Sequence, residues 1–250
     1  MNDNYNRTVD EAELETLSKE REKSGKRHPV SIVMRALAYA LCISATITAA
    51  VNVAEGGAAD TRLFSPIIAI ALLLLIWGVE KFGRLRVPVY LDTALCLFIC
   101  GALPLGSTYG FYGSVPGWDK LLHTLSGFVF YFVGLCIGDL VAGKAEGKRR
   151  VIIATLIALT VSLSVGYLWE LFEFAGDSLF GMNNQRWQNG LLEELADGTY
   201  IVSDPRGTAL IDTMSDMIFA FAGTLTCFIP TLIAFLLKPS RIDGAVMKKL

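Results

Sequence analysis

Acidic residues and one histidine stand at the ends of apolar segments in three separate parts of the chain. The three groups are Asp119, Lys120 and His123; Glu170, Glu173 and Asp177; and Asp212 and Asp216. Within each group the acids and the histidine are spaced by three or four residues, so a helix would carry them on one face. Ionisable side chains inside a membrane are costly and usually have a function. One histidine with several carboxylates is a ligand set that suits Zn, Mn, Fe or Mg.

The residue types assign candidate roles to these side chains. We expect His123, Glu170, Glu173, Asp212 and Asp216 to be ligands of a divalent metal ion. The catalytic candidates are His123 itself and Asp119 and Asp177, as a general base or as a hydrogen-bond partner of a ligand. Crowded carboxylates repel one another, and a metal ion, Lys120 or shared protons would relieve that repulsion. The alternative is a salt-bridged, hydrated funnel mouth that holds helices together.

Long apolar runs must position these groups. Of the 250 residues, 53% are hydrophobic and 18% are charged, whereas soluble domains carry about 25% charged residues. Six runs follow one another, from Val30 to Val53, Phe64 to Phe82, Val87 to Leu105, Leu121 to Val141, Val151 to Phe174 and Ala209 to Leu237. Each approaches or exceeds the roughly 20 residues that span a bilayer as a helix. The sequence therefore predicts an all-α polytopic bundle of six transmembrane helices.

The distribution of lysine and arginine predicts the orientation of the bundle. Basic residues are dense in the N-terminal tail (1–28), in the links after the second and fourth runs, and in the C-terminal tail (239–250). Cytoplasmic loops are the ones enriched in such residues. We therefore expect both tails in the cytoplasm, flanking a transmembrane domain over 29–238. All three acidic groups then lie at the non-cytoplasmic face. No basic block is interleaved with aromatic residues, so nucleic acid is not an expected partner.

A long polar link, at about 177–207, joins the fifth and sixth runs on that same face. Most connections are shorter, and long ones are often functional. The link is expected to be either a lid over the acidic groups or a mobile loop. Arg186 and Arg206 in the link, together with Lys120, are the candidates for binding a phosphate or carboxylate of a substrate.

The motifs Asp119-Lys120-x-x-His123, Glu170-x-x-Glu173 and Asp212-Thr213-Met214-x-Asp216 resemble those of the YjdF-type family of bacterial inner-membrane proteins. That family is similar to the VanZ-like proteins, from whose pattern Glu173 and Ala220 depart. The resemblance covers about Leu85 to Leu237 and implies a multi-pass protein of the bacterial plasma membrane. Because some VanZ-like proteins are linked to glycopeptide resistance, it also implies a role in cell-envelope chemistry.

Three functions fit these observations, and the residues leave them open. The first is a metal-dependent enzyme that acts on a lipid-linked or cell-envelope substrate from the outer face. The second is a proton-coupled transporter, because acids inside a membrane are typical of proton relays. The third is a non-catalytic protein that binds membrane lipid through its head group. The sequence does not indicate the oligomeric state.

Overall fold

The computed structural model describes residues 27–57, 61–186, 193–194, 200–201 and 208–249. Within these residues, six helical segments are long and apolar enough to cross a membrane. They are α2 (Pro29–Ala54), α3 (Thr61–Gly83), α4 (Val89–Cys100) with its π-helical continuation η1 (Gly101–Thr108), α6 (Trp118–Ala142), α7 (Gly147–Phe180) and α8 (Thr208–Leu237). The predicted all-α bundle of six membrane-spanning helices is confirmed.

The remaining elements are short. A single helical turn, α5 (Phe111–Ser114), precedes α6, and a 3-10 segment, η2 (Pro239–Gly244), follows α8. Two antiparallel strand pairs consist of two residues per strand: β1 (Leu85–Arg86) with β4 (Lys248–Lys249), and β2 (Glu193–Glu194) with β3 (Tyr200–Ile201). The first pair ties the C-terminal segment to the link between α3 and α4.

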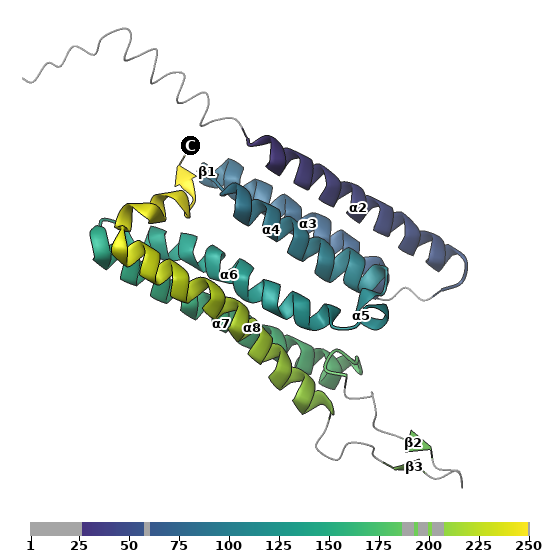
Figure 1. Cartoon of the computed structure of the whole chain (residues 1–250). Helices are drawn as coiled ribbons and strands as arrows, with labels where there is room; N and C mark the ends of the chain where they lie inside the picture. Colours follow the sequence, from purple (N-terminus) through teal and green to yellow (C-terminus); the bar gives the residue numbers. More distant parts are fainter. Residues whose placement is uncertain (1–26, 58–60, 187–192, 195–199, 202–207, 250) are drawn as a thin grey trace, which may run out of the picture.

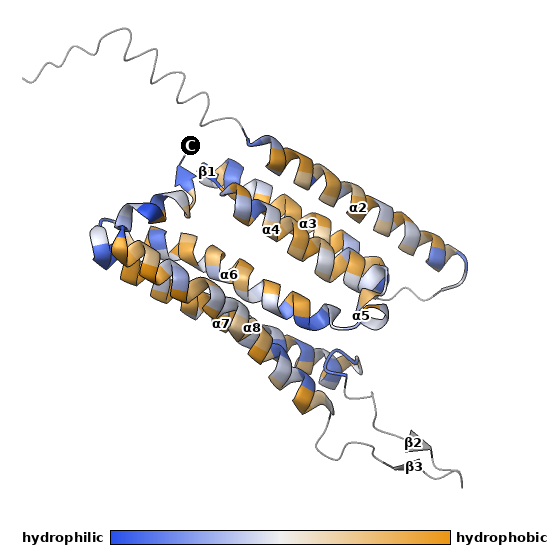
Figure 2. Ribbon diagram, in the orientation of Figure 1, coloured by the Kyte–Doolittle hydropathy of each residue, from blue (hydrophilic) through white to orange (hydrophobic). Residues whose placement is uncertain are grey.

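The helices form two groups of three, α2–α3–α4 and α6–α7–α8, with α4 beside α6 (Figure 1). The outer faces are apolar along most of their length, as the orange bands in Figure 2 show. Large side chains such as Leu75 and Phe172 are exposed there. Exposed apolar surface of this extent is what lipid-facing helices require, and it supports a multi-pass membrane protein.

Glycines bring the helices of the second group into backbone contact. A Cβ atom on Gly223 of α8 would lie 2.1 Å from the carbonyl oxygen of Thr124, and one on Gly127 of α6 would lie 2.1 Å from that of Ala220. Gly138 makes a similar close contact between α6 and α7, against Ala154. Small residues allow such close approach in membranes, so α6 is locked between α7 and α8.

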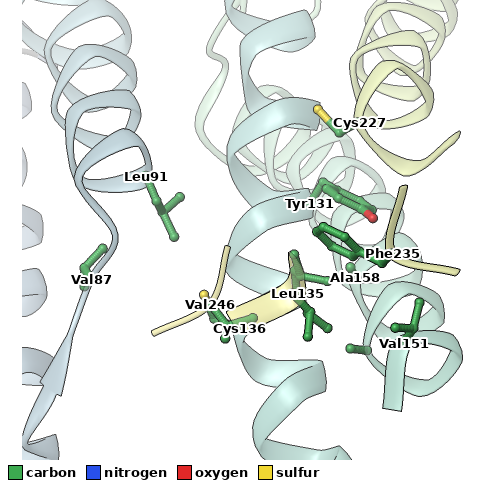
Figure 3. Close-up of a cluster of buried hydrophobic side chains, with 12 residues drawn as sticks. Val87, Leu91, Tyr131, Leu135, Cys136, Val151, Ala158, Cys227, Phe235 and Val246 are labelled. Atoms are coloured by element: carbon green, nitrogen blue, oxygen red, sulfur yellow. The ribbon is translucent and has the colours of Figure 1, made fainter. Parts of the chain in front are cut away.

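The C-terminal segment packs into the bundle, whereas the sequence predicted a tail over 239–250. Ile242 and Val246 are buried at 1% and 5% exposure. They join a cluster with Leu91 of α4 and with Tyr131 and Leu135 of α6 (Figure 3). Ala245 and Met247 pack against the same cluster, so the segment links the two helix groups. The N-terminal tail, apart from Arg27 and His28, lies outside the described residues.

A buried ion-pair network holds the first three helices together. Arg35 of α2 binds Asp92 of α4 at 2.6 Å and Glu80 of α3 at 2.9 Å, and Arg27 also reaches Glu80, at 2.6 Å. The two guanidinium groups therefore balance the two acids. This network lies at the same end of the bundle as β1 and the C-terminal segment, and the acidic groups of α6 and α8 lie at the opposite end (Figure 1).

Candidate functional site

The three groups identified in the sequence meet at one end of the second helix group. The first two turns of α6 and the second and third turns of α8 bring Asp119, Lys120, His123, Asp212 and Asp216 together, and α7 adds Glu170. Because α6 and α8 both begin at this end, and the glycine contacts deeper in the bundle hold them close, these side chains face one another. We call these six residues the His–carboxylate cluster.

Three side chains in the cluster are arranged as metal ligands would be. One ligand atom from each of Asp119, His123 and Asp216 lies within 4.8 Å of the others. The Nε2 atom of His123 is 3.7 Å from Oδ1 of Asp119 and 3.6 Å from Oδ1 of Asp216. These separations are too long for hydrogen bonds. They approach the roughly 3.4 Å between neighbouring ligands when a tetrahedral metal lies about 2.1 Å from each.

Glu170 is a buried acid aimed at the other nitrogen of the histidine. Its Oε1 is 4.0 Å from Nδ1 of His123, and the residue is 5% exposed. Neither oxygen has a hydrogen-bond partner among the described residues; the hydroxyl of Thr213 faces the carboxylate without normal hydrogen-bond geometry. Metal-binding histidines usually donate their second N–H to a carboxylate. Glu170 is thus placed where it could orient His123, and its expected role as a metal ligand stays a prediction.

Two cations contact the carboxylates of the cluster: Lys120, which belongs to it, and Arg186, which lies beside it. The Nζ atom of Lys120 lies 2.5 Å from Asp216, 2.8 Å from Asp212 and 3.4 Å from Asp119. Arg186, in the turn after α7, donates to Asp119 at 3.0 Å. Four carboxylates and these two cations leave two negative charges when His123 is neutral. A divalent cation would balance that excess.

Asp177 lies on α7 beyond the cluster and serves the turn that follows the helix. Its two oxygens accept hydrogen bonds from the backbone N–H groups of Asn184 and Gln185, at 2.7 and 2.9 Å. This turn positions Arg186 against Asp119 and the Gln185 amide against Thr213, to which it donates at 2.7 Å. The contacts of Asp177 are thus structural, and none of them supports the expected catalytic role.

Glu173 is also set apart from the close contacts of the cluster. The carboxylate of Glu173 accepts a hydrogen bond from the indole Nε1 of Trp169 at 2.8 Å, on the same helix. It is half-buried and faces the cluster from one turn beyond Glu170. Arg206 lies outside the described residues, as does most of the link at 187–207. The structure therefore does not test whether this link is a lid.

Tyr112 is a neighbour of the cluster that the sequence analysis did not identify. It belongs to α5, outside the spanning helices. Partial burial raises its pKa above the ordinary value, and the charges of Asp119 and Glu173 raise it further. The phenol therefore stays protonated and can act as a hydrogen-bond donor near the cluster. In the sequence, only the short separation between Tyr112 and Asp119 indicates that the phenol lies near the cluster, because a one-turn helix is too short to show a periodic pattern.

Comparison with known proteins places the chain in a family. A model of the family described as predicted membrane protein (DUF2238) matches residues 34–236, and the chain belongs to this family. A search of curated proteins and a search of solved structures each gave no match. The matched region includes most or all of each of the six helices and the whole His–carboxylate cluster. The narrower YjdF-type and VanZ-like resemblance stays a prediction.

Proposed function

We propose that this DUF2238-family protein is a metal-dependent membrane enzyme whose His–carboxylate cluster binds one divalent cation. The observation that carries the proposal is the grouping of Asp119, His123 and Asp216, with, behind the histidine, the buried carboxylate of Glu170, which has no hydrogen bond of normal geometry among the described residues. A salt-bridged scaffold would not require a buried acid without a hydrogen bond, which is costly. A metal on Nε2 of His123 would account for it, because the Nδ1 proton would then point to Glu170.

The arrangement suits hydrolysis or transfer at a phosphoryl or carbonyl group. A bound Zn, Mn, Fe or Mg ion would polarise such an oxygen or lower the pKa of a bound water. Glu170 would hold the imidazole of His123, and Lys120 and Arg186 would bind a negatively charged substrate group. The cluster lies at one end of the membrane-spanning helices α6, α7 and α8. The expected substrate is therefore a lipid-linked or cell-envelope molecule.

The basic residues support one orientation in the membrane. Arg27 before α2, Lys81 in the last turn of α3, Arg84 after it, and Lys148 and Arg149 at the start of α7 lie at the end opposite to the cluster. The enrichment of Lys and Arg in cytoplasmic loops supports placing that end in the cytoplasm. The cluster would then face outward from the bacterial plasma membrane.

A proton-coupled transporter receives less support from the contacts. Such a protein requires acids in the opposite half of the membrane that connect to the cluster. Glu80 and Asp92 lie there, but Arg27 and Arg35 neutralise them within the first helix group. These two acids are therefore part of a structural ion-pair network. A protein that only binds lipid head groups would likewise not require the buried acid behind His123.

Replacement of His123 by alanine should weaken metal binding strongly. Purified protein dialysed against Zn or Mn should retain about one metal ion per chain, measured by inductively coupled plasma mass spectrometry. His123→Ala should weaken binding at least tenfold, since loss of even an outer-shell partner typically costs about 10–100-fold. His28→Ala is the matched control, because the second histidine lies at the opposite end. Wild-type protein that holds no stoichiometric metal after repletion would refute the proposal.

A further inference from the structure

A chain of polar side chains leads from the turn after α7 to His123. The side-chain amide of the buried Gln185 donates a hydrogen bond to Oγ1 of Thr213 on α8, at 2.7 Å. The hydroxyl of Thr213 faces the carboxylate of Glu170 on α7. Oε1 of Glu170 in turn lies 4.0 Å from Nδ1 of His123 on α6. The chain therefore joins this turn to all three helices that form the His–carboxylate cluster.

The direction of the first hydrogen bond decides where the proton of Thr213 goes. An amide N–H can only donate, so the oxygen of Thr213 accepts from Gln185 and its own proton remains to be donated. The hydroxyls of Thr224 and Thr231 donate to the carbonyl group four residues earlier on α8. Thr213 makes no such bond within the described part of the chain, where the carboxylate of Glu170 is the acceptor that faces it. The proton of Thr213 is therefore directed to Glu170.

Glu170 differs from the acids on the other side of the imidazole in having no cation. Nζ of Lys120 lies 2.5 Å from Asp216 and 3.4 Å from Asp119, the two acids near Nε2 of His123. No lysine or arginine lies within ion-pair distance of Glu170 among the residues that the structure describes. A carboxylate without a cation is the stronger acceptor for the imidazole proton. That proton is therefore expected on Nδ1, which leaves Nε2 for a metal ion.

We propose that Thr213 and Gln185 are positioning residues that hold Glu170 against Nδ1 of the histidine and so present Nε2 to the metal ion. The inference rests on the proposed function and adds two residues outside the cluster to the same site. Gln185 is itself fixed, because its backbone N–H donates to the buried carboxylate of Asp177 at 2.9 Å. The turn after α7 thereby controls which nitrogen of the histidine carries the proton.

Thr213→Val tests the inference, because valine has nearly the shape of threonine but lacks the hydroxyl. We expect the affinity for Zn, measured by competition with a chelator, to fall about tenfold, the lower end of the range for residues that orient a metal ligand. Thr213→Ser keeps the hydroxyl and should bind Zn like the wild type. Thr226→Val is the matched control, since it makes the same substitution on α8 at a hydroxyl that donates to the carbonyl of Gly223. It should leave the affinity unchanged.

Gln185→Glu reverses the first hydrogen bond, because the new carboxylate can only accept. The hydroxyl of Thr213 would then donate to the new carboxylate and turn away from Glu170, so the affinity for Zn should again fall. An added negative charge near a cation site would by itself raise the affinity. A fall would therefore identify the loss of orientation, and an affinity equal to or above that of the wild type would overturn the inference.

The position of the proton on His123 gives a readout that does not require metal. The chain has two histidines, so labelling with nitrogen-15 gives two sets of ring signals in NMR spectra, and His28→Ala assigns them. The metal-free protein is measured at about pH 8, where histidine is ordinarily neutral. We expect the proton on Nδ1 in the wild type and in Thr213→Ser. It should shift toward Nε2 in Thr213→Val and Gln185→Glu.

The outcomes separate this inference from the proposed function. If the wild type binds Zn and Thr213→Val matches it in affinity and in the position of the proton, the inference fails and the proposed function stands. If the wild type binds no Zn but the proton shifts as expected, the metal site is refuted and the orientation of the histidine is supported. Equal losses of affinity in Thr213→Val and Thr226→Val would also overturn the inference, because any valine on α8 would then disturb the site.

Discussion

Lys120→Met should lower the thermal stability of the metal-free protein and make stability depend on metal. The ammonium contacts Asp216, which is 1% exposed, and Asp212, which is 8% exposed. Removing one partner of a buried ion pair typically costs about 3–5 kcal/mol. A divalent cation should restore most of this loss, because it supplies the missing positive charge and stabilises the state that binds it. The measurement is the thermal midpoint with and without Zn or Mn.

Lys144→Met is the control, because this lysine is exposed at the other end of the bundle. It should leave both midpoints close to those of the wild type. If Lys120→Met is equally unstable with and without metal, the cluster is a salt-bridged scaffold. The experiment thus separates the two interpretations that the sequence left open.

Gly223→Ala should disrupt the packing that assembles the cluster. The added methyl group would lie 2.1 Å from the carbonyl oxygen of Thr124, a backbone atom that moves only if α6 and α8 separate. Overpacking of this kind costs about 1–3 kcal/mol, occasionally more. Separation of the two helices would also pull Asp216 away from His123, so metal binding should fall together with the thermal midpoint.

Gly166→Ala on α7 provides the matched control. Its Cβ atom would lie 3.8 Å from the side chain of Ala220, an ordinary contact. Alanine is favoured over glycine in helices by up to about 1 kcal/mol, so this variant should be neutral or slightly more stable. A Gly223→Ala protein with wild-type stability and metal affinity would contradict the assigned role of the α6–α8 contact.

Most of the fold could be predicted because lipid imposes a simple pattern on sequence. Runs such as Val30 to Val53 differ in composition from the links, and a spanning segment must satisfy its own backbone. The predicted ends were off by several residues where helices extend into polar sequence; α7 continues to Phe180, six residues beyond the expected Phe174. The packing of the C-terminal segment was missed because its apolar residues, Ile242 and Ala245 to Met247, form only short runs between charged residues.

The cluster could be predicted in outline because helical spacing places Asp119 with His123 and Asp212 with Asp216. Spacing cannot show which acids on a longer stripe point inward. Glu170 and Asp177 lie on one face of α7, but the carboxylate of Asp177 accepts hydrogen bonds from backbone N–H groups in the turn that follows the helix. The Arg35–Asp92 pair was also missed, because 57 residues separate its partners and no local pattern relates them.

An anomalous-difference map from crystals grown with Mn or Zn tests the metal site most directly. The proposed function predicts one peak within about 2.0–2.3 Å of Nε2 of His123 and of one oxygen each from Asp119 and Asp216. Glu170 should then accept a hydrogen bond from Nδ1. A map without a peak at this position, with the Lys120 ammonium still bound between Asp212 and Asp216, would contradict it.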